Sequence, residues 1–285
     1  MSFWRVVSVI GKTLIWSGLL ILSFVAYELW GTGIAEARNQ KALRKQFTQA
    51  LQKPAGAAEQ TPNEEPPVLP ASGAVAVIKF PKLSVEKAVV EGVSVSDLKK
   101  GPGHYPETPM PGHVGNVAIA GHRTTYGAPF YKLDELKPDD AILITTREGQ
   151  FRYRVTKSEV VGPDDSSVLN PTADNRLTLT TCHPRFTASQ RLVVIARLDG
   201  NASTKPNPKT TATTEVGKPA GLSGSRVPRQ PAVGWGTAVA LAWLATWAMS
   251  KLWLRWPAYA VGAPVIIVLL FLFFENFSRL LPANI

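Results

Sequence analysis

The 285-residue chain has only one cysteine, Cys182. A single thiol cannot form an internal disulfide, and it cannot supply the several cysteine ligands of a structural zinc or iron–sulfur site. Disulfide-stapled miniproteins and cysteine-rich metal domains are therefore excluded. We expect no cofactor and no metal site, and the length allows one or two domains with a hydrophobic core.

Acidic residues are scarce at the end of the sequence, and this produces much of the net charge of +10. Residues 200–285 carry 8 basic and 2 acidic groups, whereas residues 72–199 carry 16 and 14. A strongly basic chain can indicate nucleic-acid binding. The region with the densest strand-like pattern is nearly neutral, so we expect no nucleic-acid partner.

Charge is almost absent from three long apolar runs. Residues 13–30 contain one charged residue, Glu28, and residues 233–250 and 256–274 contain none. About 18 apolar residues nearly span the hydrocarbon core of a bilayer as a helix. We therefore expect an N-terminal transmembrane helix and a C-terminal transmembrane hairpin rather than three buried core helices.

The basic residues next to these runs indicate an orientation. Lys251 and Arg255 lie between the last two runs, which predicts a cytoplasmic turn and an extracytoplasmic central domain in a multi-pass membrane protein. The first run does not decide the orientation, because basic residues flank it on both sides: Arg5, Lys12, Arg38, Lys41, Arg44 and Lys45. The small-x-small sequence Ala35-Glu36-Ala37 leaves open a cleaved signal peptide.

Composition divides the rest of the chain. A polar stretch at 36–53, expected to be helical, precedes a Pro/Ala/Glu-rich linker at 54–72, and the Thr/Pro/Gly/Lys-rich residues 200–232 are typical of a disordered tether. This tether either only solubilises the chain or attracts anionic membrane or wall polymers. We predict an N-terminal anchor, a linker, a central domain, a basic tether, a hairpin and a tail, at 1–35, 36–72, 73–199, 200–232, 233–274 and 275–285.

The central domain has the pattern of an all-β fold. Short runs rich in β-branched residues lie at 74–80, 85–93, 116–120, 141–146, 150–161, 176–181 and 191–198. Short helical turns are expected at 95–98 and 130–136. Because no long helix alternates with the strands, a closed or nearly closed barrel is favoured over an α/β layer fold.

Three residues at strand ends can together perform acyl transfer. Cys182 ends one strand-like run, His122 ends another, and Arg191 opens the last. A cysteine thiolate can attack a carbonyl, a histidine can protonate the leaving amine, and a guanidinium can stabilise the oxyanion or hold the peptide. From the residues alone, a buried and inert cysteine is the alternative.

The sequence around these residues resembles the sortase family. TLTTC at 178–182, with Arg191 nine residues on, resembles the sortase signature TLxTC…R, and AGHRTTYGAPFYKLDEL resembles the segment that bears the sortase histidine. Together with VVEGVSVSDLKKGPGHYP, these segments are most similar to class E sortases of high-GC Gram-positive bacteria. The resemblance covers residues 74–198.

The resemblance implies a closed eight-stranded β-barrel and a cysteine transpeptidase. Such an enzyme cleaves an LAxTG- or LPxTG-like sorting signal of a surface protein after Thr, holds a thioacyl intermediate on Cys182, and transfers it to an amine of a lipid-linked peptidoglycan precursor. The resemblance also implies that His122 is the general acid/base and that Arg191 is the clamp for the substrate and the oxyanion. Thr181 is then a neighbour of the substrate, and Tyr126 lines the pocket that favours Ala in the signal.

Other interpretations depend on single features. The linker lacks an Asp-Pro-aromatic lid motif, which favours surface-protein anchoring, whereas the C-terminal hairpin is common in pilus-type sortases, so pilin polymerisation stays an alternative. A non-enzymatic membrane-tethered β-barrel is another. The order His, Cys, Arg disfavours a papain-like peptidase. His183 is expected to point away from the thiol, and the motif spacing selects Arg191 over Arg185 and Arg197. Carboxylate pairs that could bind calcium are more simply solvated turns: Asp139-Asp140 and Asp164-Asp165.

Overall fold

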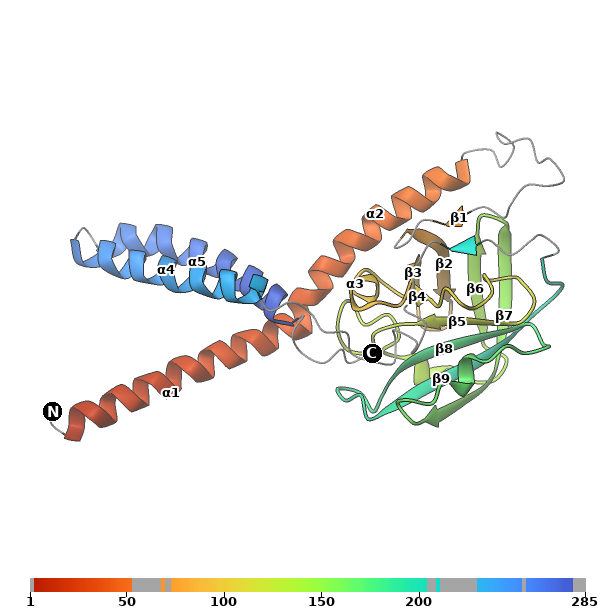
Figure 1. Cartoon of the computed structure of the whole chain (residues 1–285), viewed down its shortest axis with the longest axis horizontal. Helices are drawn as coiled ribbons and strands as arrows, with labels where there is room; N and C mark the ends of the chain where they lie inside the picture. Colours follow the sequence, from red (N-terminus) through yellow and green to blue (C-terminus); the bar gives the residue numbers. More distant parts are fainter. Residues whose placement is uncertain are drawn as a thin grey trace. The chain divides into compact units, whose positions relative to one another are not determined.

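The computed structural model describes residues 3–52, 68–69, 73–203, 209–210, 230–252 and 255–278. Most of the linker expected at 54–72 and most of the tether expected at 200–232 lie outside these residues. The described part forms two compact units. One contains the apolar N-terminal helix and the last two helices, and the other contains a second helix and all the strands of the barrel (Figure 1).

The apolar unit consists of helices that suit a membrane. Helix α1 spans Phe3–Ala26 and continues through a π-helical turn at Tyr27–Gly31, and α4 (Gln230–Leu252) and α5 (Arg255–Ser278) form a hairpin. By length and composition, three helices could cross a membrane: Val6–Gln52, Gln230–Leu252 and Trp256–Ser278. The three expected apolar helices are therefore confirmed. The last two helices extend a few residues beyond their uncharged runs, and the first begins ten residues before its run.

The hairpin is closely packed because it contains a small residue at a contact point. Gly262 of α5 faces the side chain of Thr246 in α4, and a Cβ at position 262 would overlap that side chain. Aromatic contacts add to the packing of this unit, with Phe24 and Phe274 ring centroids 5.2 Å apart. Small residues allow such close helix approach in membrane proteins.

The second unit is a closed eight-stranded barrel, as expected. Its strands follow the order β2-β3-β4-β5-β8-β9-β7-β6, and β6 pairs with β2 to close it. The bounds are β2 Ala74–Phe80, β3 Val85–Glu91, β4 Gly103–His104, β5 Asn116–Ala120, β6 Ala141–Thr146, β7 Gly149–Val161, β8 Arg176–His183 and β9 Gln190–Leu198. A further parallel bridge joins β1 (Val68–Leu69) to β10 (Lys209–Thr210).

Three short helices complete the barrel unit. The four-residue helix α3 (Val95–Leu98) begins with a capping box formed by Ser94 and Asp97, and η2 (Leu133–Glu135) lies within the second expected turn. A 3₁₀ turn, η3 (Ser166–Leu169), lies between β7 and β8. Of the barrel strands, β4 is the one that the expected runs do not include. It has two residues and begins at the last residue of the sequence Gly101-Pro102-Gly103.

Strands β5 and β8 are neighbours in the barrel and are buried along most of their length. Every residue of β5 is buried, as are residues 177–182 of β8, whereas β6 alternates between buried and partly exposed positions. β5 and β8 are parallel neighbours, in register from Asn116 opposite Arg176 to Ala120 opposite Thr180. Parallel strands end at the same edge of a sheet, so the segments that follow β5 and the last residues of β8 meet there.

Helix α2 (Thr32–Gln52) lies against strand β3. The contacts come from the residues of α2 that belong to the barrel unit. Strand β3 pairs with β4 only at Val90 and Glu91, so its earlier residues lack a neighbouring strand on that side. The side chain of Gln40 fills this place. Its amide donates to the Ala88 carbonyl at 3.0 Å, and its carbonyl accepts from the Ala88 N–H at 2.7 Å. A buried ion pair between Glu36 and Lys87, at 2.6 Å, lies one turn earlier on the helix.

Candidate active site

Because β5 and β8 are parallel, His122, which follows β5, and Cys182, near the end of β8, lie at the same edge of the sheet. The register that pairs Ala120 with Thr180 continues into the next residue, because the Gly121 N–H donates to the Thr180 carbonyl at 3.1 Å. The Thr181 hydroxyl donates to the Gly121 carbonyl at 2.7 Å. These two hydrogen bonds hold the segment before His122 against the segment before Cys182. The hydroxyl of Thr181 therefore joins the two segments, and its contact with substrate stays a prediction.

Arg191 lies directly across from the cysteine. Antiparallel pairing of β8 and β9 places Cys182 opposite Arg191, and the Arg191 Nη1 is 4.0 Å from Sγ. The same nitrogen also donates to the carbonyls of Ala188 and Gln190, which orients the guanidinium. Arg191 Nε is buried and has no hydrogen-bond partner among the described residues. The guanidinium is thus held near the thiol with one donor still available for a ligand.

The environment of the thiol favours its protonated form. Burial raises the pKa of Cys182 to about 11, and the positive charges of Arg191 and Arg123 lower it only in part. Desolvation disfavours the thiolate more than the two guanidinium groups stabilise it. In the free protein at neutral pH, nearly all molecules therefore carry a neutral thiol.

His122 lies in a turn with an unusual backbone. The Thr125 hydroxyl is 3.4 Å from His122 Nδ1, and the Tyr126 ring lies 5.1 Å from the imidazole, centroid to centroid. Tyr126, Gly127 and Ala128 all have positive φ angles, of 49°, 71° and 42°. A positive φ is costly for the two non-glycine residues on either side of Gly127, and such strain concentrates at functional sites. The structure therefore brings Tyr126 against the predicted general acid/base.

This turn also rests on helix α2. A Cβ placed on Gly127 would overlap the carboxylate of Glu36, the residue that pairs with Lys87. Position 127 thus requires glycine both for its φ angle and for the close approach of α2.

Arg123 is a site residue that the sequence pattern did not reveal. Its side chain is 2% exposed and donates from Nη1 to the Cys182 carbonyl at 3.0 Å. The same nitrogen lies 3.2 Å from His183 Nδ1, and Nη2 pairs with Asp134 at 2.9 Å. His183 thus supports the neighbouring loop, as its position in the strand suggested. The signal for Arg123 is its place directly after His122, where a basic residue points back toward the strand that carries the cysteine.

The other basic candidates lie elsewhere. Arg185 pairs with Asp134 at 3.0 Å and stacks on the Tyr131 ring, and the Arg197 side chain is 66% exposed and 4.0 Å from Asp174. Of the three arginines that the sequence singled out, Arg191 is the one in contact with the cysteine.

The carboxylate pairs take part in local contacts. Asp165 accepts from the Ser167 N–H at 3.0 Å and caps η3, and Asp140 pairs with Lys82 at 2.6 Å. Within the described ranges, no group of three or more His, Cys, Asp or Glu side chains is arranged to hold a metal ion.

A groove of about 350 Å³ lies at the other end of the β5–β8 pair, where β5 begins. One side is formed by Tyr105–Pro109, which follow β4, and the other by residues around η3, with Asn116 of β5 between them. The Tyr105 hydroxyl is 3.4 Å from the Thr180 hydroxyl on β8. Burial raises the pKa of Tyr105, and the charge of Arg191 opposes this shift.

Comparisons with known proteins show which proteins this chain is similar to. The family profile of the sortase domain matches residues 78–199. Sortase SrtE1 of Streptomyces coelicolor is 33% identical over 205 residues, which are 66% of this chain and 56% of that protein. The putative sortase YwpE of Bacillus subtilis is 31% identical over 85 residues, 30% of this chain and 83% of that protein. The solved structure of sortase E from Streptomyces avermitilis is 38% identical and aligns with a TM-score of 0.42 over 46% of this chain and 90% of that one. The chain belongs to the sortase family, whose members are cysteine transpeptidases.

Proposed function

We propose that this protein is a membrane-anchored transpeptidase that cleaves an LAxTG- or LPxTG-like sorting signal after Thr and transfers the surface protein to a cell-wall precursor amine. The observation that carries the proposal is the guanidinium of Arg191 at 4.0 Å from the sulfur of Cys182, at the edge that also ends in His122. A nucleophile, a proton carrier and an anion stabiliser at one edge are the requirements of acyl transfer.

The first half-reaction forms a thioester. The Cys182 sulfur attacks the carbonyl carbon of the signal's Thr while the thiol proton goes to His122. Arg191 stabilises the negative charge that develops on the carbonyl oxygen, through donors that include its Nε. The imidazolium of His122 then gives its proton to the nitrogen of the following Gly, the C–N bond breaks, and the C-terminal fragment leaves.

The second half-reaction releases the enzyme. An acceptor amine attacks the thioester carbonyl, and His122 accepts the amine proton. The amide bond forms, the C–S bond breaks, and Cys182 recovers its proton from His122. The raised pKa of the Cys182 thiol means that only a small fraction of molecules carries the thiolate at neutral pH, which is expected to give slow turnover.

The groove at the other end of the β5–β8 pair is suited to the signal. It is lined by mixed apolar and polar groups such as Val93, Tyr105 and Leu169, and it leads to β8 through the contact of Tyr105 with Thr180. We assign it to the signal residues before the cleaved bond. Tyr126, whose ring lies 5.1 Å from the imidazole of His122, is assigned to the Ala preference that the resemblance to class E sortases implies.

The membrane helices set the proposed location. Lys251 lies at the end of α4, in the last turn of the first helix of the hairpin. Positive residues favour the cytoplasmic side, so the hairpin turn is assigned to the cytoplasm and the barrel to the outer face. The acceptor is then the amine of a lipid-linked peptidoglycan precursor, and the substrates are exported proteins with a C-terminal signal.

The hairpin also favours a second candidate, a pilin-polymerising sortase, in which the acceptor is a lysine amine of another subunit. One experiment separates the candidates. The full chain in nanodiscs is incubated with LAxTG and LPxTG peptides and with glycine-type, diaminopimelate-type or lysine-type amines, and the products are read by mass spectrometry.

The expected result is an acyl adduct on Cys182 and transfer to the glycine-type or diaminopimelate-type amine. Transfer to the lysine-type amine alone supports the second candidate. A thiol that alkylates rapidly but forms no adduct with any signal peptide contradicts both, and a thiol inert to alkylation at high pH in the folded protein supports a non-enzymatic barrel.

A further inference from the structure

One side of the groove has no buried core of its own. In residues 162–170, which contain η3, no side chain is fully buried, and Leu169 packs only partly against the small cluster around Tyr105. Local hydrogen bonds shape the turn, with Asp165 capping Ser167 and the Asn170 N–H donating to the Ser167 carbonyl at 3.1 Å. These contacts fold the segment on itself but do not attach it to the barrel.

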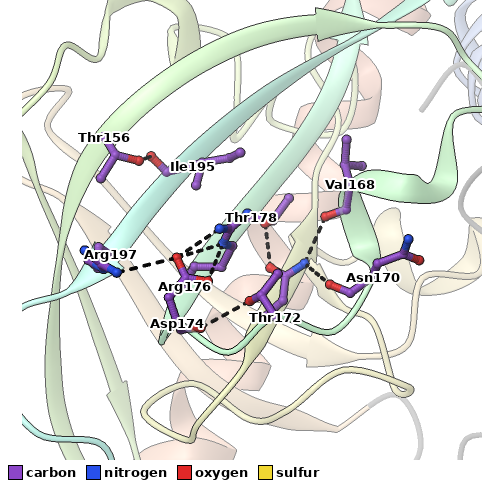
Figure 2. A network of polar contacts seen from close by, with 10 residues as sticks. Thr156, Val168, Asn170, Thr172, Asp174, Arg176, Thr178, Ile195 and Arg197 are labelled. Atoms are coloured by element: carbon purple, nitrogen blue, oxygen red, sulfur yellow. Dashed lines mark hydrogen bonds and ion pairs between the residues drawn. The ribbon is translucent and has the colours of Figure 1, made fainter.

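A buried amide makes that attachment, and Figure 2 labels its partners Val168, Asn170 and Thr178. Asn116, the first residue of β5, is 1% exposed, and its Nδ2 donates to the carbonyls of Val168 at 2.9 Å and Asn170 at 3.0 Å. Its Oδ1 accepts from the Thr178 hydroxyl at 2.6 Å. Because the two main-chain carbonyls can only accept, the NH₂ end of the amide must face them.

The chemistry of this contact is specific to asparagine. Two donors on one nitrogen reach two carbonyls of the η3 segment, and the oxygen is oriented by a hydroxyl of the neighbouring strand. An aspartate at position 116 would place an oxygen against two carbonyl oxygens, and an alanine would leave both carbonyls without this donor. No other common side chain of the same size supplies this pattern.

The opposite side of the groove is held in another way. The His104 ring lies 2.9 Å from Glu91 and 3.0 Å from the Pro109 carbonyl, and the Thr108 hydroxyl accepts from the Ala118 N–H at 3.1 Å. Several buried groups thus hold the Tyr105–Pro109 side. The η3 side depends on a single buried side chain.

We propose that Asn116 is a positioning residue for recognition of the sorting signal. It holds residues 166–170 at the distance from Tyr105–Pro109 that fits the peptide, and it has no role in the chemistry at Cys182. This inference rests on the proposed function. It assigns a substrate-binding role to the end of the β5–β8 pair that lies away from the catalytic residues.

The test compares two isosteric variants with a matched control, all in the full chain in nanodiscs. Asn116→Asp removes both donors, and Thr178→Val removes the hydroxyl that orients the amide while leaving the donors. Asn201→Asp makes the same chemical change at an exposed position outside the groove. Three quantities are measured: backbone hydrogen exchange of residues 166–170 without peptide, KM and kcat for the best signal peptide, and the rate of Cys182 alkylation by iodoacetamide.

For Asn116→Asp we expect exchange of residues 166–170 to become about tenfold faster or more and KM to rise about tenfold, as for a loss of one to two hydrogen bonds. The kcat value and the alkylation rate should stay within about twofold of wild type, because the contact is remote from the thiol. Thr178→Val should change exchange and KM in the same direction by a smaller factor. Asn201→Asp should change none of them.

Several results would overturn the inference. Unchanged exchange in both groove variants would mean that Asn116 does not hold the segment. A fall in kcat with unchanged KM would place its effect at the chemistry. If Asn116→Asp does not fold, Thr178→Val decides alone, with faster exchange and a higher KM in favour and wild-type values against.

The two proposals fail in different ways. If the wild-type protein forms no acyl adduct with any signal peptide, the proposed function is wrong. The inference that this groove recognises the signal is then wrong as well. If the wild type cleaves a peptide and Asn116→Asp retains its KM, only the inference about Asn116 is wrong.

Discussion

The two ends of the β5–β8 pair differ in how their polar side chains are paired. At the first end, the polar groups of Asn116, Thr178 and Arg176 meet partners: two carbonyls, an amide oxygen and Asp174. At the other end, Cys182 carries a raised pKa and Arg191 Nε has no partner among the described residues. The same two strands therefore provide both a satisfied polar network and an unsatisfied one.

The difference teaches where reactivity comes from in this fold. Buried polar groups are ordinarily paired, and the first end follows that rule and gains rigidity. The second end leaves donors and a nucleophile without ordinary partners, so a ligand can supply them. Mutations at the two ends should separate substrate recognition from chemistry.

The largest effect on activity is expected when the nucleophile is removed. Cys182→Ala should abolish both cleavage of a signal peptide and transfer to an amine, because no other thiol exists in the chain. Product formation by mass spectrometry measures this. Transfer retained in this variant would rule out the thioacyl mechanism.

Replacing the guanidinium tests whether the unsatisfied donor matters. Arg191→Lys keeps the charge but loses the planar fork and the Nε donor, and kcat/KM should fall by roughly 10²–10³, the cost of one lost oxyanion donor. Steady-state kinetics with a fluorogenic signal peptide measure the loss. Arg197→Lys, at an exposed position of the same strand, is the control. Near-wild-type kinetics for Arg191→Lys would assign the clamp to another residue.

The raised pKa of the Cys182 thiol predicts how its alkylation rate depends on pH. With a pKa of about 11, Cys182 should react with iodoacetamide at pH 8 roughly two orders of magnitude more slowly than a free cysteine, whose pKa is near 8.5. The rate should rise about tenfold per pH unit up to pH 10, since only the thiolate reacts. Arg123→Met should slow the reaction further, because Arg123 lowers this pKa.

Stability should depend on the same group. A pKa that is raised on folding gives a contribution that is complete below the pKa of the unfolded thiol and is lost as the pH rises toward 11. The wild type should lose this stability between about pH 9 and 11, whereas Cys182→Ala should not. A plateau in the alkylation rate near pH 8.5 would contradict both expectations.

The smallest effect is expected at the outer part of the paired end. Asp174 contacts Arg176 at 2.9 Å and Arg197 at 4.0 Å, but these groups are partly exposed to solvent. Asp174→Asn should lower the free energy of unfolding by less than about 1 kcal/mol and leave kcat and KM unchanged, since exposed ion pairs contribute little. Chemical denaturation measures the stability. A drop in activity would mean that the surface ion pairs transmit an effect to the groove.

Much of the barrel could be predicted from local pattern, because most strands are long enough to show it. The runs at 74–80, 116–120 and 141–146 match β2, β5 and β6 at both ends. Strand β4 could not be found this way, since two residues beside a Gly-Pro-Gly turn carry no periodicity. Its partners β3 and β5 define it.

The site shows the same limit. The motifs around His122 and Cys182 named the residues at the reactive edge, and the register of β5 and β8 places them there. Arg123 and Asn116 were missed because a charged residue or an asparagine at a strand end ordinarily faces solvent. Only the fold shows that both are buried and bonded to segments about 50 to 60 residues away in sequence.

Helix α2 has a consequence for any shortened form of the protein. A strand with unpaired backbone groups is a template for pairing with another chain, and the Gln40 amide occupies the backbone groups of Ala88 on the outer side of β3. A form that starts at β2 would expose this edge and remove Glu36 from beneath Gly127. We therefore expect such a form to self-associate, whereas a form that starts at Gly33 keeps the edge covered and leaves out the apolar helix α1.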